Sequence, residues 1–157
     1  MRIGFGRDVH RLQEGRRLIL GGVVVPFNKG EAAHSDGDVL IHAVIDALLG
    51  AAALGDIGSH FPDSDPAYKD IDSGVLLKKT AAVIAEAGYQ ISNIDSTVIL
   101  EKPKLRPHID GIRENLAGLI GIQAERISVK AKTAEKLGPV GSGDAVEAEA
   151  AVLLIRK

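Results

Sequence analysis

A helical stretch that is apolar on most of its faces most constrains the fold of this chain. Residues 37–54 read GDVLIHAVIDALLGAAAL, and Gly55 follows as an expected C-terminal stop. A helix with so few polar positions has to be buried by other elements. Its polar side chains, Asp38, His42 and Asp46, are four residues apart and form one stripe. The sequence therefore predicts a buried helix with a single polar stripe.

Hydrophobic periodicity elsewhere predicts strands and helices in mixed order. Residues 2–10 are typical of a strand, and 17–20 and 23–25 flank Gly21-Gly22 as the arms of a hairpin. Ser35 and Asp38 have the spacing of a capping box, with Asp in place of Glu or Gln. The other expected elements are helices at 73–87 and 107–120, strands at 91–101, 126–133 and 145–155, and loops at 26–36, 55–69 and 137–144. This order predicts one domain, residues 1–157, of the α+β class, with a mixed sheet and helices packed on one face.

Composition excludes several classes of function. The chain has 19 Lys and Arg against 21 Asp and Glu, which argues against a broad basic surface for nucleic acid. It has no Cys, which excludes disulfides and thiolate metal sites and fits a reducing compartment. No apolar leader precedes the first strand, and the longest apolar stretch, 40–54, is too short to span a bilayer. We expect a cytoplasmic protein with no nucleic-acid or membrane partner.

Three residues have the character of metal ligands. Asp8 and His10 are two apart on a predicted strand, so their side chains point to the same face. His42 lies on the buried helix, from which folding can bring it to the same point. One carboxylate and two imidazoles form a catalytic zinc set that leaves a fourth position open. A lone His on an apolar helix is also typical of a satisfied core residue, and spacing alone leaves both interpretations open.

Two loops carry further candidates. His34 and Ser35 precede the buried helix, where free N–H groups bind phosphate, although Ser35 is equally typical of a simple N-cap. Asp56–Gly58 and Phe61–Asp65 form an acidic loop, which is either a solvated turn or a site for hydroxyl groups or a second divalent ion.

The ends of two predicted strands are rich in lysine. Lys102-Pro103-Lys104 ends one strand, and Lys130 to Glu135 ends another. Such lysines commonly solvate a sheet edge. Grouped with Thr133 and Glu135, they are also suited to phosphate and to Mg²⁺, which prefers hard oxygen ligands. The glycine-rich loop at 138–143 is weak evidence for an anion cradle.

Taken together, these segments resemble the 2-C-methyl-D-erythritol 2,4-cyclodiphosphate synthase family over the whole chain. The matching segments are Arg2-Ile3-Gly4-x-Gly6-x-Asp8-Val9-His10, Ala33 to Val39, Asp46 to Gly58, Phe61-Pro62-Asp63-x-Asp65-Pro66, Lys102 to Lys104, and Lys130-Ala131-x-Thr133-x-Glu135-x-Leu137-Gly138. The resemblance implies an enzyme that cyclises 4-diphosphocytidyl-2-C-methyl-D-erythritol 2-phosphate and releases CMP. This is a phosphorus–oxygen lyase reaction of the non-mevalonate isoprenoid pathway.

The resemblance also implies roles for individual residues. Asp8, His10 and His42 would bind Zn²⁺, and Glu135 would help to place a second ion, Mg²⁺ or Mn²⁺. His34 and Thr133 match the positions of the transition-state stabilisers. The implied substrate-binding residues are Asp8, His10, His34, Ser35, Asp56, Ile57, Gly58, Phe61, Pro62, Asp63, Ser64, Asp65, Leu100, Glu101, Lys102, Pro103, Lys104, Leu105, Arg106, Ala131, Lys132, Thr133, Ala134 and Glu135.

The family forms homotrimers, with sheets facing a threefold axis and active sites between subunits. The resemblance therefore implies that the metal end of each site comes from one chain and the cytidine pocket from the next. Two positions depart from the family pattern: Lys132 replaces a threonine common in members, and Ser142 lies in a loop where some members carry an arginine that binds an isoprenoid diphosphate. A metal-dependent phosphohydrolase and a non-catalytic trimeric scaffold are the alternative functions.

Overall fold

A mixed sheet of five strands organises the molecule, for which the computed structural model describes residues 1–62 and 64–157. The strand order is β4-β1-β7-β5-β6. The strands are β1 (Arg2–Glu14), β4 (Lys29–Ala32), β5 (Tyr89–Ile99), β6 (Ile127–Lys132) and β7 (Ala145–Arg156). Only the β5–β6 pair is parallel among these, so the carboxyl ends of β5 and β6 lie at the same edge of the sheet.

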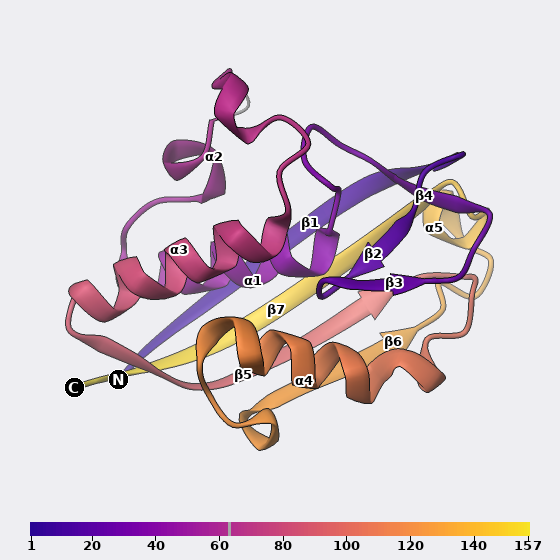
Figure 1. Ribbon diagram of the computed structural model, residues 1–157. Helices are drawn as coiled ribbons and strands as arrows, with labels where there is room; N and C mark the ends of the chain where they lie inside the picture. Colours follow the sequence, from indigo (N-terminus) through magenta and orange to yellow (C-terminus); the bar gives the residue numbers. More distant parts are fainter. Residues whose placement is uncertain (63) are drawn as a thin grey trace.

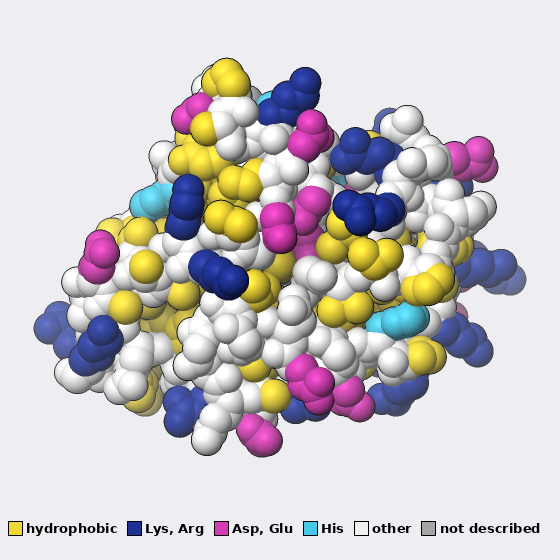
Figure 2. Space-filling model, viewed as in Figure 1, with side chains coloured by type: hydrophobic (Ala, Val, Ile, Leu, Met, Phe, Trp, Pro, Cys, Tyr) yellow, Lys and Arg dark blue, Asp and Glu magenta, His cyan; other side chains and the backbone are white. Residues whose placement is uncertain are grey.

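Three helices cover one face of this sheet (Figure 1). They are α1 (Val39–Ala52), α3 (Ser73–Glu86) and α4 (Ile109–Ile120). The hairpin of β2 (Leu18–Leu20) and β3 (Val23–Val25) packs beside α1 and α4. The shorter elements are α2 (Ile57–His60), α5 (Gly138–Gly141), η1 (Pro66–Tyr68), η2 (Arg106–His108) and η3 (Ala124–Arg126). Charges of both signs are interspersed with apolar side chains on this helical face (Figure 2).

Helix α1 lies at the centre of the core, and the backbone of β1 packs directly against the backbone of α1. Most α1 side chains are fully buried, as its apolar sequence predicts. A Cβ added to Gly4 would lie 1.9 Å from the carbonyl oxygen of Ala47, and one added to Gly6 would lie 2.1 Å from that of Ala43. Only glycine permits this approach. The approach brings the Asp8 end of β1 beside the polar stripe of α1.

The opposite face of β1 presents apolar side chains to solvent. Ile3, Phe5 and Val9 are 77%, 62% and 55% exposed, and they alternate with the core-facing residues of the strand. Exposed apolar side chains grouped on one face of a strand are typical of surfaces that bind other chains. This face is therefore a candidate surface for association with other chains.

The predicted α+β class, with a mixed sheet and helices on one face, is confirmed. The Ser35 capping box is wrong, because α1 begins after Asp38, whose carboxylate accepts a hydrogen bond from the N–H of Ile41. Three predicted loops are more structured than expected: 26–36 contains β4, 55–69 contains α2 and η1, and 137–144 contains α5. No described helix is long and apolar enough to cross a bilayer. The cytoplasmic location stays a prediction.

Candidate metal centre and two cavities

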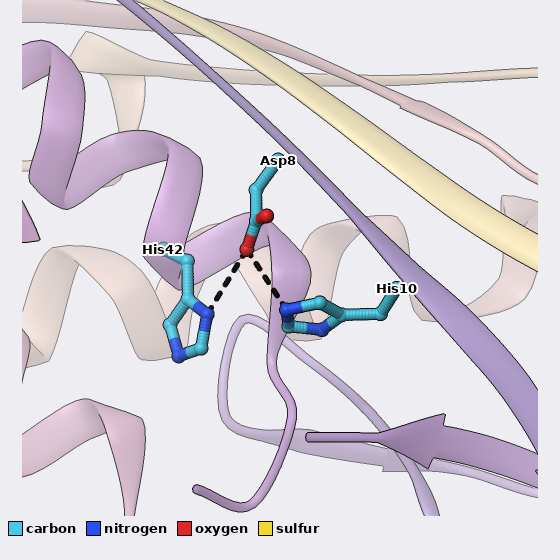
Figure 3. Close-up of side chains that lie close together, drawn as sticks. All are labelled: Asp8, His10 and His42. Carbon is cyan, nitrogen blue, oxygen red and sulfur yellow. Dashed lines mark hydrogen bonds and ion pairs between the residues drawn. The ribbon is translucent and has the colours of Figure 1, made fainter. Parts of the chain in front are cut away.

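Asp8, His10 and His42 converge on one point between β1 and α1 (Figure 3). Oδ2 of Asp8 lies 2.9 Å from Nε2 of His10 and 3.1 Å from Nδ1 of His42. One candidate ligand atom from each residue lies within 4.8 Å of the others. The two-residue spacing on β1 and the register of β1 against α1 together produce this cluster.

The Asp8 carboxylate stays ionised although it is partly buried. Burial opposes ionisation of Asp8, but hydrogen bonds and positive charge from His10 and His42 hold its pKa well below the usual range. Burial likewise opposes protonation of His10, but its hydrogen bond and charge interaction with Asp8 raise its pKa. A divalent cation would supply the positive charge that the imidazoles supply here. The donor set, one carboxylate and two imidazoles, fits a metal ion.

The ring nitrogens that point away from Asp8 also have partners. Nδ1 of His10 donates to the carbonyl oxygen of Gly37 over 2.6 Å, which leaves Nε2 facing the cluster. Nε2 of His42 lies 3.2 Å from Oγ of Ser35 and 3.1 Å from Oγ of Ser73. Such outer partners fix ring orientation in metal sites.

A cavity of about 230 Å³ opens onto this cluster. The predicted site residues that line it are Asp8, His10, His34, Ser35, His42, Ile57, Gly58 and Phe61. Asp56 and Asp65 instead cap α2 and η1 by accepting hydrogen bonds from the N–H groups of Ser59 and Ala67. Pro62 and Ser64 are exposed, and Asp63 lies outside the described residues.

A second cavity, of about 420 Å³, lies at the shared carboxyl edge of β5 and β6. The predicted residues that line it are Leu100, Glu101, Pro103, Lys104, Leu105, Arg106, Ala131, Lys132 and Thr133. Lys102 lines a neighbouring cavity that also contains Lys136 and Ser142. His34 and Thr133, which the resemblance pairs in catalysis, thus belong to different cavities of the same chain.

The turn after β6 is organised around two glutamates. Oγ1 of Thr133 donates to Oε1 of Glu135 over 2.5 Å. Oε2 of Glu101 accepts from the N–H groups of Ala134 and Lys136, at 3.3 and 3.4 Å. Glu135 is not a member of the cluster of potential metal ligands found around Asp8 in the described part of the chain.

Sequence reasoning missed several residues of the site. Tyr68, Ile71 and Leu76 line the first cavity, and Ser73 contacts His42. Phe61 and Tyr68 pack edge to face, with ring centroids 5.5 Å apart. Apolar residues and a serine at a helix start have no distinctive pattern, so sequence alone carried little signal for them.

Comparison with known sequences identifies the family of this chain. The sequence model of the YgbB family matches residues 1–155. The chain belongs to the YgbB family. A curated YgbB-type relative from Burkholderia vietnamiensis, named 2-C-methyl-D-erythritol 2,4-cyclodiphosphate synthase, is 59% identical over 155 residues, which are 99% of this chain and 98% of the relative.

Solved structures agree with the YgbB assignment. A 2-C-methyl-D-erythritol 2,4-cyclodiphosphate synthase solved in a CDP-bound form matches with a TM-score of 0.91 and 41% identity, covering 98% of this chain and all of that one. The bifunctional IspDF protein from Campylobacter jejuni matches with a TM-score of 0.96 and 41% identity over 99% of this chain. This chain spans 42% of that longer protein. The resemblance read from the sequence is therefore confirmed.

Proposed function

We propose that this chain converts 4-diphosphocytidyl-2-C-methyl-D-erythritol 2-phosphate to 2-C-methyl-D-erythritol 2,4-cyclodiphosphate and CMP. The observation that carries the proposal is the convergence of Asp8, His10 and His42 in a cavity that His34 and Phe61 also line. The Burkholderia relative is named for this product and is 59% identical along nearly its whole length. Both features fit a lyase of isoprenoid biosynthesis.

The reaction needs alignment more than it needs a protein nucleophile. An oxygen of the 2-phosphate attacks the β-phosphorus, a new P–O–P bond closes the ring, and the bond from that phosphorus to the oxygen of CMP breaks. Holding the two phosphates in line supplies roughly 7–11 kcal/mol in favourable intramolecular cases. Residues of the first cavity would hold the methylerythritol part, and residues of the second cavity would hold the cytidine diphosphate.

Two divalent ions fit the proposal. When bound by Asp8, His10 and His42, Zn²⁺ supplies Lewis-acid polarisation of phosphoryl oxygens. Glu135 offers a hard carboxylate oxygen suited to Mg²⁺ or Mn²⁺. His34 and Thr133 would donate hydrogen bonds to phosphate oxygens as their charge shifts in the transition state.

We also propose a homotrimer whose sites lie between subunits. The exposed Ile3, Phe5 and Val9 give β1 an apolar face that a second chain would cover. The separation of His34 and Thr133 into different cavities supports a site completed by two chains. In such an assembly the first cavity of one subunit would face the second cavity of its neighbour.

A ³¹P NMR time course separates this function from the two alternatives. The cytidine-linked substrate is incubated with the protein, Zn²⁺ and Mg²⁺. Cyclic diphosphate plus CMP is the expected result. A phosphohydrolase would give CMP and a linear product, and a scaffold would leave the substrate intact, so either result would contradict the proposal. His10→Ala is the matched inactive control.

A further inference from the structure

A hydrogen-bonded chain leads from Asp36 through Ser73 to His42. The Ser73 hydroxyl donates to Oδ1 of Asp36, and the Ser73 N–H donates to Oδ2 of the same carboxylate over 3.0 Å. Oγ of Ser73 lies 3.1 Å from Nε2 of His42. Ser73 is fully buried at the first turn of α3, and Asp36 lies in the loop before α1. The chain thus joins three separate segments behind one metal-ligand candidate.

The number of hydrogens fixes the direction of each bond. A carboxylate only accepts, and a hydroxyl has one hydrogen to donate. The single hydroxyl hydrogen of Ser73 is directed to Asp36, so its oxygen has lone pairs available for His42. Nε2 of His42 must therefore be the N–H donor of that contact. Nδ1, on the other side of the ring, lies 3.1 Å from Oδ2 of Asp8 and donates to that carboxylate. A metal ion bound between Asp8 and His42 would take the place of this proton, and Nδ1 would then be the ligand atom.

Ser35 gives the same ring nitrogen a second oxygen. Its Oγ lies 3.2 Å from Nε2 of His42 and accepts a hydrogen bond from the N–H of Gly37. The Ser35 hydroxyl has no carboxylate that directs its hydrogen among the described contacts. Its orientation is therefore not fixed in the way that Asp36 fixes Ser73.

We propose that Asp36 and Ser73 are positioning residues that keep Nε2 of His42 protonated, so that Nδ1, which faces Asp8, is the nitrogen that binds a metal ion. This inference rests on the proposed metal centre. Without the Ser73 oxygen, Nε2–H would lose a directed acceptor. Without the Asp36 carboxylate, the Ser73 hydroxyl would be free to rotate and donate to Nε2. The only ring proton would then stay on Nδ1, where it would compete with a metal ion for the ligand atom.

Zinc affinity, measured by competition with a chromogenic chelator, tests the proposal. Ser73→Ala should lower the affinity roughly 10- to 100-fold, the usual effect of removing an outer partner of a metal ligand. Asp36→Asn should lower it in the same direction although Asp36 does not contact His42. The double variant should lose less than the product of the two single losses, because both residues act through one hydrogen bond.

A matched control removes another buried hydroxyl from the same helix. Thr80 is fully buried on α3 and donates to the carbonyl oxygen of Leu76, away from the cluster. Thr80→Val should keep wild-type zinc affinity. Wild-type affinity in Asp36→Asn, or an equal loss in Thr80→Val, would overturn the positioning role and indicate that Ser73 acts through packing alone.

A spectroscopic measurement on the wild-type protein covers the case in which a variant fails to fold. Long-range ¹H–¹⁵N spectra of the zinc-loaded protein should show a slowly exchanging Nε2–H for His42, assigned by its loss in His42→Ala. A rapidly exchanging Nε2–H would overturn the proposal. A wild-type protein that binds no zinc would overturn the metal centre itself, whereas zinc binding with unaffected variants would overturn only the positioning role.

Discussion

The carboxylate of Glu31 lies directly behind His10, with its Oε1 4.0 Å from Nδ1 of the imidazole. Oε1 also accepts a hydrogen bond from the N–H of Val39, the first residue of α1. Oε2 is buried and has no hydrogen-bond partner among the described residues. Burial, and then the negative charge of Asp38, raise the pKa of Glu31 well above its ordinary value. The fold therefore carries an acidic group that is costly to ionise.

We predict that Glu31→Gln makes stability less dependent on pH. Because the pKa is raised in the folded state, the contribution of Glu31 is fully present below its ordinary value of 4.5 and is lost as pH rises through the folded value. Glutamine stays neutral and keeps an oxygen for the N–H of Val39. Urea unfolding in a chelator should show the variant gaining stability over wild type as the pH rises above 4.5, the ordinary pKa of this carboxyl.

Glu14→Gln is the control for this measurement, because Glu14 is an exposed carboxylate at the end of β1. Its stability difference from wild type should change little over the same range. A Glu31→Gln curve parallel to the wild-type curve would show that Glu31 is as easily ionised in the folded protein as in the unfolded chain.

We predict that Gly6→Ala both destabilises the protein and impairs zinc binding. The added methyl would lie 2.1 Å from the carbonyl oxygen of Ala43, so β1 and α1 would have to separate. Overpacking of this kind typically costs about 1–3 kcal/mol. Separation would also move Asp8 away from His42. Thermal unfolding and zinc titration give the two readouts.

The control for that variant is Gly111→Ala, an exposed position in α4 where an added Cβ meets nothing within 4 Å. Alanine there should stabilise the helix by up to about 1 kcal/mol and leave zinc binding unchanged. If both variants behaved alike, the close approach of β1 to α1 would not be what positions the metal cluster.

We predict that Glu135→Gln keeps zinc but weakens the dependence of turnover on magnesium. Glu135 is separate from the Asp8 cluster and accepts a hydrogen bond from Thr133, which lines the second cavity. An amide is a poorer ligand for Mg²⁺ than a carboxylate. Magnesium titration of turnover, with zinc content determined by elemental analysis, would separate the loss of the magnesium response from any loss of zinc.

The control is Glu125→Gln, which removes an exposed carboxylate in η3 and should respond to magnesium as the wild type does. A wild-type magnesium response in Glu135→Gln would remove Glu135 from the metal site.

We predict that two inactive variants complement each other once subunits exchange. His42→Ala damages the first cavity and Lys104→Ala the second. In a mixed trimer with sites between chains, some interfaces would combine two intact halves. Turnover of the mixture should exceed that of either variant, whereas a mixture of His42→Ala with His10→Ala should stay inactive. Exchange without recovery would favour a site within one chain.

Much of the candidate site was predictable because the strand and helix periodicities of the sequence determine which side chains share a face. The strand period placed Asp8 and His10 on one face, and the helix pattern placed His42 on a polar stripe of a buried helix. The contact between those elements depends on Gly4 and Gly6, whose role is visible only when α1 is in place. Asp36 and Ser73 are 37 residues apart and share no period, so their contact required the fold.

The errors in the predicted fold have local causes. Ser35 and Asp38 both belong to residue types that cap helices well, so capping propensity alone does not show which of them begins α1. The Asp38 carboxylate also accepts hydrogen bonds from the N–H groups of Gly21 and Gly22, which are in place only when the hairpin has folded. Strand β4 was missed because its four residues, Lys-Gly-Glu-Ala, lack apolar alternation and buried Glu31 looks like a surface residue.

The parallel pairing of β5 and β6 divides the molecule into two regions that can change separately. The second cavity is built from loops at the shared carboxyl edge of these strands, whereas the metal cluster depends on β1 and α1. Substitutions at positions such as Lys132 can change the lining of the second cavity without moving Asp8, His10 or His42. For protein engineering, the loops at 100–106 and 131–135 are therefore the part of this scaffold to randomise, with the β1–α1 contact kept unchanged.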